Sequence, residues 1–135
     1  MFFRKKKQYP LPKFPDTVIP TFRNMCEALP VEKLDELKAE LDVCVDRLED
    51  AARNNSNLNI SLARQIAQRC DYLIQQYPGY ARKKQELVIG AVHYFAIADD
   101  PFPEEEFATG FDDDARVMNH VLEALGIDNW YLDTP

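Results

Sequence analysis

Residues 87–98 read LVIGAVHYFAIA, and this run predicts the centre of the fold. It follows the basic residues 82–84 and is apolar around almost the whole circumference of a helix. A helix that is apolar all round is buried among other elements. Gly90 and Ala91 carry little or no side chain, so a neighbouring helix can approach there closely. We therefore expect a buried central helix over about residues 80–98.

The residues that precede this run are spaced for a second long helix. From Val31 onward the apolar positions alternate steps of three and four, which is an a/d seam. The seam consists of Leu34, Leu37, Leu41, Cys44, Leu48 and Ala51. It is short for an independent coiled coil, which favours packing inside a bundle. Oligomerisation through residues 34–51 is the alternative.

Three further segments carry helix signals, and none of the chain alternates as a strand does. The predicted fold is therefore all-α: a compact bundle of four to five helices with a buried central helix and an acidic helical-hairpin loop. The other predicted helices are residues 16–29, broken near Pro20; residues 62–77, capped by Asn59 or Ser61 and ended by Pro78-Gly79; and residues 113–125, with Gly126 as a left-handed C-cap.

Charge is distributed unevenly along the 135 residues, a length that fits one domain. Residues 1–15 form a basic, Pro-rich arm with five cations and no acid, and residues 16–135 form a single helical domain. Because the net charge is −7, the domain carries −7 − 5 = −12. A negative body repels phosphates, which argues against nucleic acid as the main ligand.

The basic arm has two interpretations. The candidate contacts with an anionic surface are Arg4, Lys5, Lys6 and Lys7. Each basic residue near an anionic membrane contributes about 1 kcal/mol, which gives weak, salt-sensitive binding. A solubilising tail is the alternative.

Cysteine usage and the N-terminus bear on location. Three cysteines in no C-x-x-C arrangement favour free thiols in a reducing compartment. No apolar core follows the first charges as it would in a signal peptide, and the longest apolar run is too short to span a bilayer. We expect a cytoplasmic protein, with peripheral contact at the inner face of the membrane as an alternative.

Carboxylates crowd residues 94–115, which read YFAIADDPFPEEEFATGFDDDA. The candidate residues for an interaction or cation loop are Asp99, Asp100, Glu104, Asp113 and Asp114. In a purely structural interpretation, Asp112 to Asp114 open the last helix, where negative charge and N-capping are favourable. Gly110 then supplies an unusual φ in the loop before it.

Two functional interpretations stand beside this one. Carboxylates from several segments suit Mg²⁺, Mn²⁺ or Ca²⁺, although the pattern is not that of an EF-hand and predicts no specific metal or other cofactor. Alternatively the acids dock a basic protein partner, with apolar anchors at Phe102, Phe107 and Phe111. These aromatic residues can instead plug the end of the bundle.

The same segment resembles the YkvA-like family, a bacterial domain family without an assigned activity. The family pattern is an aromatic-rich apolar helix followed by P-x-D-x-x-P-D-x-x-P-x-x-G-x-x-D-D, and this chain has ADDPFPEEEFATGFDDD without a gap. The matching residues are Asp100, Pro103, Glu104, Gly110, Asp113 and Asp114, while Ala98 and Phe107 replace prolines. The resemblance implies a helical hairpin with an ordered loop and brings no substrate.

Catalytic patterns are sparse. The chain has no G-x-S-x-G motif, no Gly-rich phosphate loop and no cysteine beside a base. A pairing of His93 with His120 across the hairpin is a further candidate for a metal or base site. The sequence favours a small non-enzymatic interaction or scaffold module over a metal-dependent hydrolase or a cation-binding protein, and it does not identify the partner.

Overall fold

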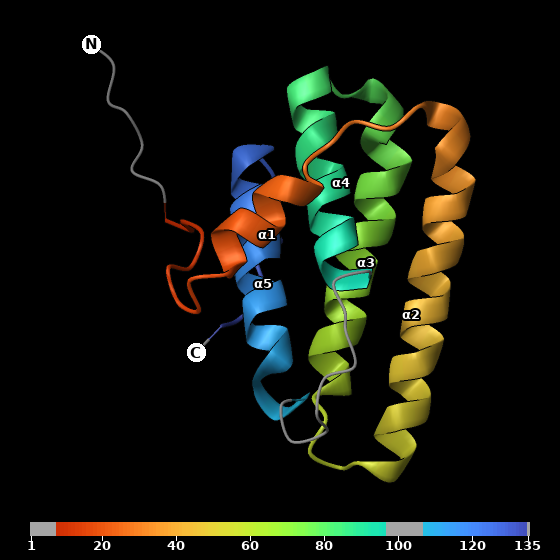
Figure 1. Cartoon of the computed structure of the whole chain (residues 1–135), viewed down its shortest axis with the longest axis vertical. Helices are drawn as coiled ribbons and strands as arrows, with labels where there is room; N and C mark the ends of the chain where they lie inside the picture. Colours follow the sequence, from red (N-terminus) through yellow and green to blue (C-terminus); the bar gives the residue numbers. More distant parts are fainter. Residues whose placement is uncertain (1–7, 97–106, 135) are drawn as a thin grey trace.

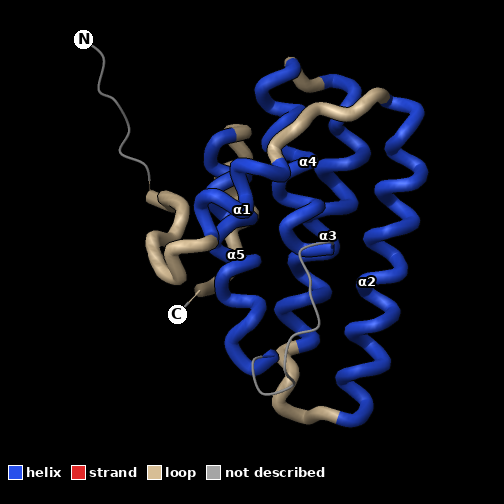
Figure 2. Tube along the Cα trace, in the orientation of Figure 1, coloured by secondary structure: helices blue, strands red, loops and turns tan. Residues whose placement is uncertain are grey.

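The computed structural model describes residues 8–96 and 107–134, with the side chains of residues 107–110 left out. Within these ranges all regular structure is helical, which confirms the predicted all-α bundle (Figures 1 and 2). Most of the predicted acidic loop, residues 97–106, lies outside the described residues. In chain order the elements are α1 (Val18–Met25), the short 3-10 helix η1 (Val31–Lys33), α2 (Leu34–Asn54), α3 (Ile60–Gln76), the 3-10 helix η2 (Tyr77–Gly79), α4 (Arg82–Ala96) and α5 (Phe107–Ala124).

The α4 helix lies at the centre of the bundle, as its sequence predicts. The helices α2 to α5 run up and down the long axis, and α1 crosses beside α4 (Figure 1). Each of the other four α-helices packs on α4. Val88, Ile89 and Val92 are fully buried there, so α4 supplies the middle of one continuous hydrophobic core.

Close packing of α1 on α4 depends on Gly90. A Cβ atom at this position would overlap Sγ of Cys26 and would lie 2.9 Å from a ring carbon of Phe22. Phe22 is itself 2% exposed, so its ring has little room to move. The absence of a side chain at Gly90 therefore sets the distance between the two helices.

The predicted break at Pro20 is wrong, because α1 runs through this residue. Pro20 is the third residue of the helix, where the backbone N–H has no partner within the helix. The ring therefore removes no hydrogen bond. The segment that the sequence marks as interrupted is one short amphipathic helix, with Val18 and Phe22 buried.

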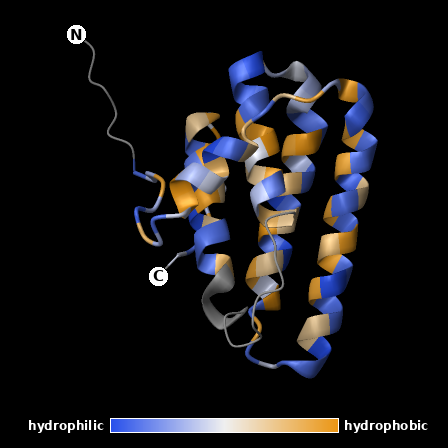
Figure 3. Cartoon of the chain, viewed as in Figure 1, coloured by the Kyte–Doolittle hydropathy of each residue, from blue (hydrophilic) through white to orange (hydrophobic). Residues whose placement is uncertain are grey.

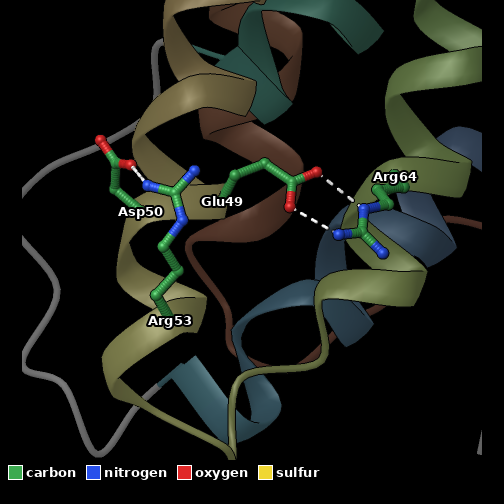
Figure 4. Close-up of polar contacts among 4 residues, drawn as sticks. All are labelled: Glu49, Asp50, Arg53 and Arg64. Atoms are coloured by element: carbon green, nitrogen blue, oxygen red, sulfur yellow. Dashed lines mark hydrogen bonds and ion pairs between the residues drawn. The ribbon is translucent and has the colours of Figure 1, made fainter.

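The seam of α2 is used within the chain, against α3 and α4. Leu37 and Leu41 are buried, and polar residues alternate with them along the helix (Figure 3). Near the connection between α2 and α3, Arg64 of α3 donates two hydrogen bonds to the carboxylate of Glu49, at 2.7 and 2.6 Å (Figure 4). The exposed pair adds little stability, but its bidentate geometry suits one register of α2 against α3.

Two helix ends follow their sequence signals. The side chain of Asn59 accepts a hydrogen bond from the N–H of Leu62 and caps α3. After α5, Gly126 has φ of +79°, and the N–H of Ile127 donates to the carbonyl of Leu122. This is the Schellman arrangement, in which a left-handed glycine lets the chain turn back on the helix.

The start of α5 differs from the prediction. The helix begins at Phe107, six residues before the expected position, so Gly110 lies within a helix and not in a loop with unusual φ. Asp112 to Asp114 occupy the second turn of α5 and cannot cap its N-terminus. Their carboxylates therefore need a different structural explanation.

Candidate functional site

The predicted site residues divide into those that the structure describes and those outside its described ranges. Outside them lie Arg4, Lys5, Lys6, Lys7, Asp99, Asp100, Phe102 and Glu104. The side chain of Phe107 is also not described. Asp113, Asp114 and Phe111 can be placed, and all three project from the first half of α5.

Phe111 belongs to the core. It is 8% exposed and packs against Phe95 at the end of α4, with ring centroids 6.5 Å apart. The ring closes the bundle where α4 stops, which is the plug arrangement that the sequence left open. It offers no exposed anchor to a partner.

Asp114 is partly buried as a residue, and its carboxyl group is shielded from solvent. Burial raises its pKa well above the usual range, and the neighbouring charge of Asp113 raises it further. Burial raises the pKa of Tyr94 in α4, Cys44 in α2 and Cys70 in α3, and the charge of Asp114 raises each of them further. An acid thus lies among side chains of all three other long helices.

The neighbouring acids Asp112 and Asp113 face an open pocket. Its volume is about 520 Å³, and it lies between the N-terminal arm and α5. We call it the arm–α5 pocket; its lining residues are Pro12, Lys13, Phe14, Pro15, Asp112, Asp113 and Arg116. Its apolar surface comes from the arm and its carboxylates come from the helix, so two segments that are distant in sequence form one site.

The arm is held in place by its own backbone. The carboxylate of Glu123 accepts hydrogen bonds from the N–H groups of Gln8 and Tyr9, at 2.8 and 3.0 Å. Nδ1 of His120 lies 3.0 Å from the carbonyl oxygen of Tyr9, so the ring donates from that nitrogen. The ring of Tyr9 stacks on Tyr131 with centroids 4.2 Å apart. The arm therefore follows α5 from Glu123 down to the pocket.

Phe14 does not join this packing. Its side chain is 83% exposed, which makes it the most exposed large hydrophobic residue in the described part of the chain. Leu11, three residues earlier, packs against the core. The arm thus presents one aromatic ring to solvent at the rim of the pocket while its other end is fixed.

The C-terminal segment supports the same end of α5. The buried amide of Asn119 accepts from the N–H of Leu132 at 2.7 Å and donates to the carbonyl of that residue at 2.9 Å. Nε of Arg69 donates to the carbonyl of Trp130, and the guanidinium lies 4.4 Å from the centre of its ring. These contacts place Tyr131 where Tyr9 stacks on it. Sequence reasoning missed Glu123, Asn119 and Arg69, because backbone recognition leaves no motif.

Among the residues that the structure describes, no cluster of side chains is suited to hold a metal ion. In residues 8–96 and 107–134, no three His, Cys, Asp or Glu side chains are grouped closely enough. Burial lowers the pKa of His93, and the charges of Glu40 and Glu27 oppose this more weakly. His120 instead forms a hydrogen bond with the carbonyl of Tyr9, and its ring packs edge-on against Phe22. The two histidines that the sequence suggested as a pair therefore have different surroundings.

The cysteines are poorly suited to nucleophilic chemistry. Burial raises the pKa of the Cys26 and Cys44 thiols to about 11, and that of Cys70 well above the usual value. The thiolate is the reactive form, so all three are predominantly protonated at neutral pH. Sγ of Cys44 lies 3.8 Å from the carbonyl oxygen of Phe95, as expected of a thiol that serves packing.

In the part of the chain that is described, no helix combines the length and apolar character needed to cross a bilayer. Comparisons with protein-family models, curated proteins and solved structures found no match to this chain. The resemblance to the YkvA-like family remains a prediction from the sequence. Fold and site together define a small all-α bundle with a pocket between its arm and its last helix.

Proposed function

We propose that this protein is a small, non-catalytic interaction module that binds a protein partner through the arm–α5 pocket. The observation that carries the proposal is Phe14, which is 83% exposed on a segment anchored a few residues away. A solvated aromatic ring beside a pocket is the arrangement of a binding anchor. Burying such a ring contributes about 1.5–3 kcal/mol to association.

Anchoring makes the ring more useful for binding. A free tail would lose conformational entropy when it docks, and this loss weakens association. Here the hydrogen bonds of Glu123 and His120 to the backbone of Tyr9 order the arm before any partner arrives. The pocket therefore provides a largely preformed surface.

The acidic segment enters this proposal through its last residues. Asp112 and Asp113 line the pocket, so part of the charge that the sequence marks as a docking surface lies beside Phe14. The protonated thiols of Cys26, Cys44 and Cys70 are consistent with a module without covalent catalysis.

Photocrosslinking tests this proposal. We expect p-benzoylphenylalanine in place of Phe14 to yield a discrete adduct in cell extract, competed by excess wild-type protein. The Phe14→Asp variant should not compete, because its ring is lost. The same photoreactive residue in place of Val43, which is exposed on α2, is the matched control. Labelling that is equal at both positions, or that Phe14→Asp competes equally well, would overturn the proposal.

A divalent-cation site, predicted from the sequence, is the second candidate, and Asp113 and Asp114 are the members of it that the structure describes. Burial raises the pKa of both carboxyl groups, which means that their negative charges lack full compensation. A bound cation would supply that compensation. The other acids proposed for this site, Asp99, Asp100 and Glu104, lie outside the described residues.

A further inference from the structure

The arm–α5 pocket combines two surfaces that suit opposite ends of one kind of side chain. Pro12, Phe14 and Pro15 form an apolar wall, and Asp112 with Asp113 contributes carboxylates. Arginine and lysine carry a long apolar stem and a cationic head. An aromatic face and a carboxylate are the two groups that attract such a head.

We propose that the arm–α5 pocket binds an arginine or lysine side chain of the partner protein, between Phe14 and Asp113. This inference rests on the proposed function and adds the chemistry of the partner. It concerns only residues that the structure describes, and it commits to a partner segment that is basic.

The pocket lining also contains two cations, Lys13 and Arg116, which formally balance Asp112 and Asp113. Lys13 is exposed, and its long side chain can turn toward solvent. Burial raises the pKa of Asp113, and the opposing effect of Arg116 is smaller. Asp112 raises the pKa further, since two like charges adjoin. A second cation would therefore stabilise the ionised form of Asp113.

The charge of the rest of the domain also favours a basic partner. The domain formed by residues 16–135 carries −12, so its long-range field attracts basic segments and accelerates their encounter. The chain's own basic residues, Arg4 to Lys7, attach at the other end of the arm, next to Gln8. Gln8 is bound by Glu123, which lies about three helical turns, or roughly 16 Å, beyond Asp112 along α5. The cations of the arm are thus tethered about 16 Å from the pocket, and the glutamine variant described below tests them as its occupant.

A peptide titration of the full chain tests the inference. The probe is a Gly-Arg-Gly-Arg-Gly-Arg-Gly peptide, compared at 150 mM salt with a peptide that has citrulline, the neutral isostere, at each arginine. Binding is followed by ¹⁵N chemical shifts, which also locate the site. We expect saturable shifts in residues 13–16 and 112–116, and at least tenfold weaker binding of the citrulline peptide.

Variants identify the contacts. We expect Asp113→Asn to weaken binding about fivefold, and Phe14→Leu, which keeps bulk but removes the ring face, about two- to fivefold. Asp46→Asn removes the same charge from an exposed position on α2 and should change binding less than twofold. Equal losses in Asp46→Asn and Asp113→Asn would show diffuse attraction and overturn the inference.

Two further outcomes would also overturn it. One is equal binding of the arginine and citrulline peptides. The other is a gain above threefold when Arg4, Lys5, Lys6 and Lys7 are all replaced by glutamine, since this would identify the chain's own arm as the occupant. Specific crosslinking at position 14 without arginine preference would leave the proposed function intact and reject only this inference.

Discussion

The hydroxyl of Tyr77 forms two hydrogen bonds with one residue: it accepts from the N–H of Leu29 at 2.7 Å and donates to the carbonyl of Leu29 at 2.5 Å. Tyr77 is fully buried at the end of α3, and Leu29 lies in the connection between α1 and α2. One side chain therefore ties this connection to the core.

Replacing Tyr77 by phenylalanine should reduce the free energy of unfolding by about 1–3 kcal/mol, because two backbone groups lose their partner. Urea denaturation measures the change. Tyr72→Phe, at a partly exposed position, is the control and should have little effect. Equal stability of Tyr77→Phe and wild type would mean that water replaces the hydroxyl without cost.

Replacing Gly90 by alanine should destabilise the protein by about 1–3 kcal/mol, because the new methyl group overlaps Cys26 and Phe22. The loss should occur although alanine favours a helix over glycine by about 1 kcal/mol. Gly79→Ala meets no atom within 4 Å and is the control. If Gly90→Ala were as stable as wild type, α1 would have to be free to shift.

Replacing Asn119 by alanine should release the C-terminal segment and cost about 1–3 kcal/mol, because the backbone of Leu132 loses both hydrogen bonds. Trp130 is the only tryptophan, so its fluorescence should shift to the red under native conditions. Asn129→Ala, at an exposed position, should leave the emission unchanged. An unshifted spectrum for Asn119→Ala would show that Arg69 holds the segment alone.

Asp114 should make stability fall as pH rises. The pKa of Asp114 is raised in the folded protein. Its contribution to folding stability is therefore complete below the pKa of an aspartate in the unfolded chain, near 3.9. That contribution is lost as pH rises through the higher folded pKa, because the buried group must then ionise. The titratable groups that interact electrostatically with Asp114 are Asp113, Tyr94, Cys44 and Cys70.

Asp114→Asn should therefore gain stability over wild type as pH increases from 4 to 8, since a neutral amide does not ionise. Chemical denaturation at each pH measures the difference, with Asp46→Asn as reference. A difference that shrinks with rising pH would mean that Asp114 is ionised favourably in the fold.

Divalent cations distinguish the two proposed functions. For an interaction module, we expect no selective rise in unfolding temperature when chelator-treated protein receives Mg²⁺, Mn²⁺, Ca²⁺ or Zn²⁺. A true site would add about 2.7 kcal/mol at 100 times its dissociation constant. A selective rise that disappears in Asp113→Asn would support the cation site instead.

The sequence by itself determined where most helices lie and which of them is buried. The apolar residues around Ile89, the cap at Asn59 and the glycine at position 126 are local signals, and the structure agrees with each. Such signals act over a few residues, so they can be recognised without knowledge of distant neighbours.

The tertiary structure decided the early start of α5 and the composition of the candidate site. Tyr9 and Glu123 are 114 residues apart, and the carboxylate recognises backbone N–H groups that every non-proline residue has. No local pattern encodes such a contact. Phe14 is exposed while Leu11 packs on the core, and this difference depends on where the anchored arm meets the assembled helices.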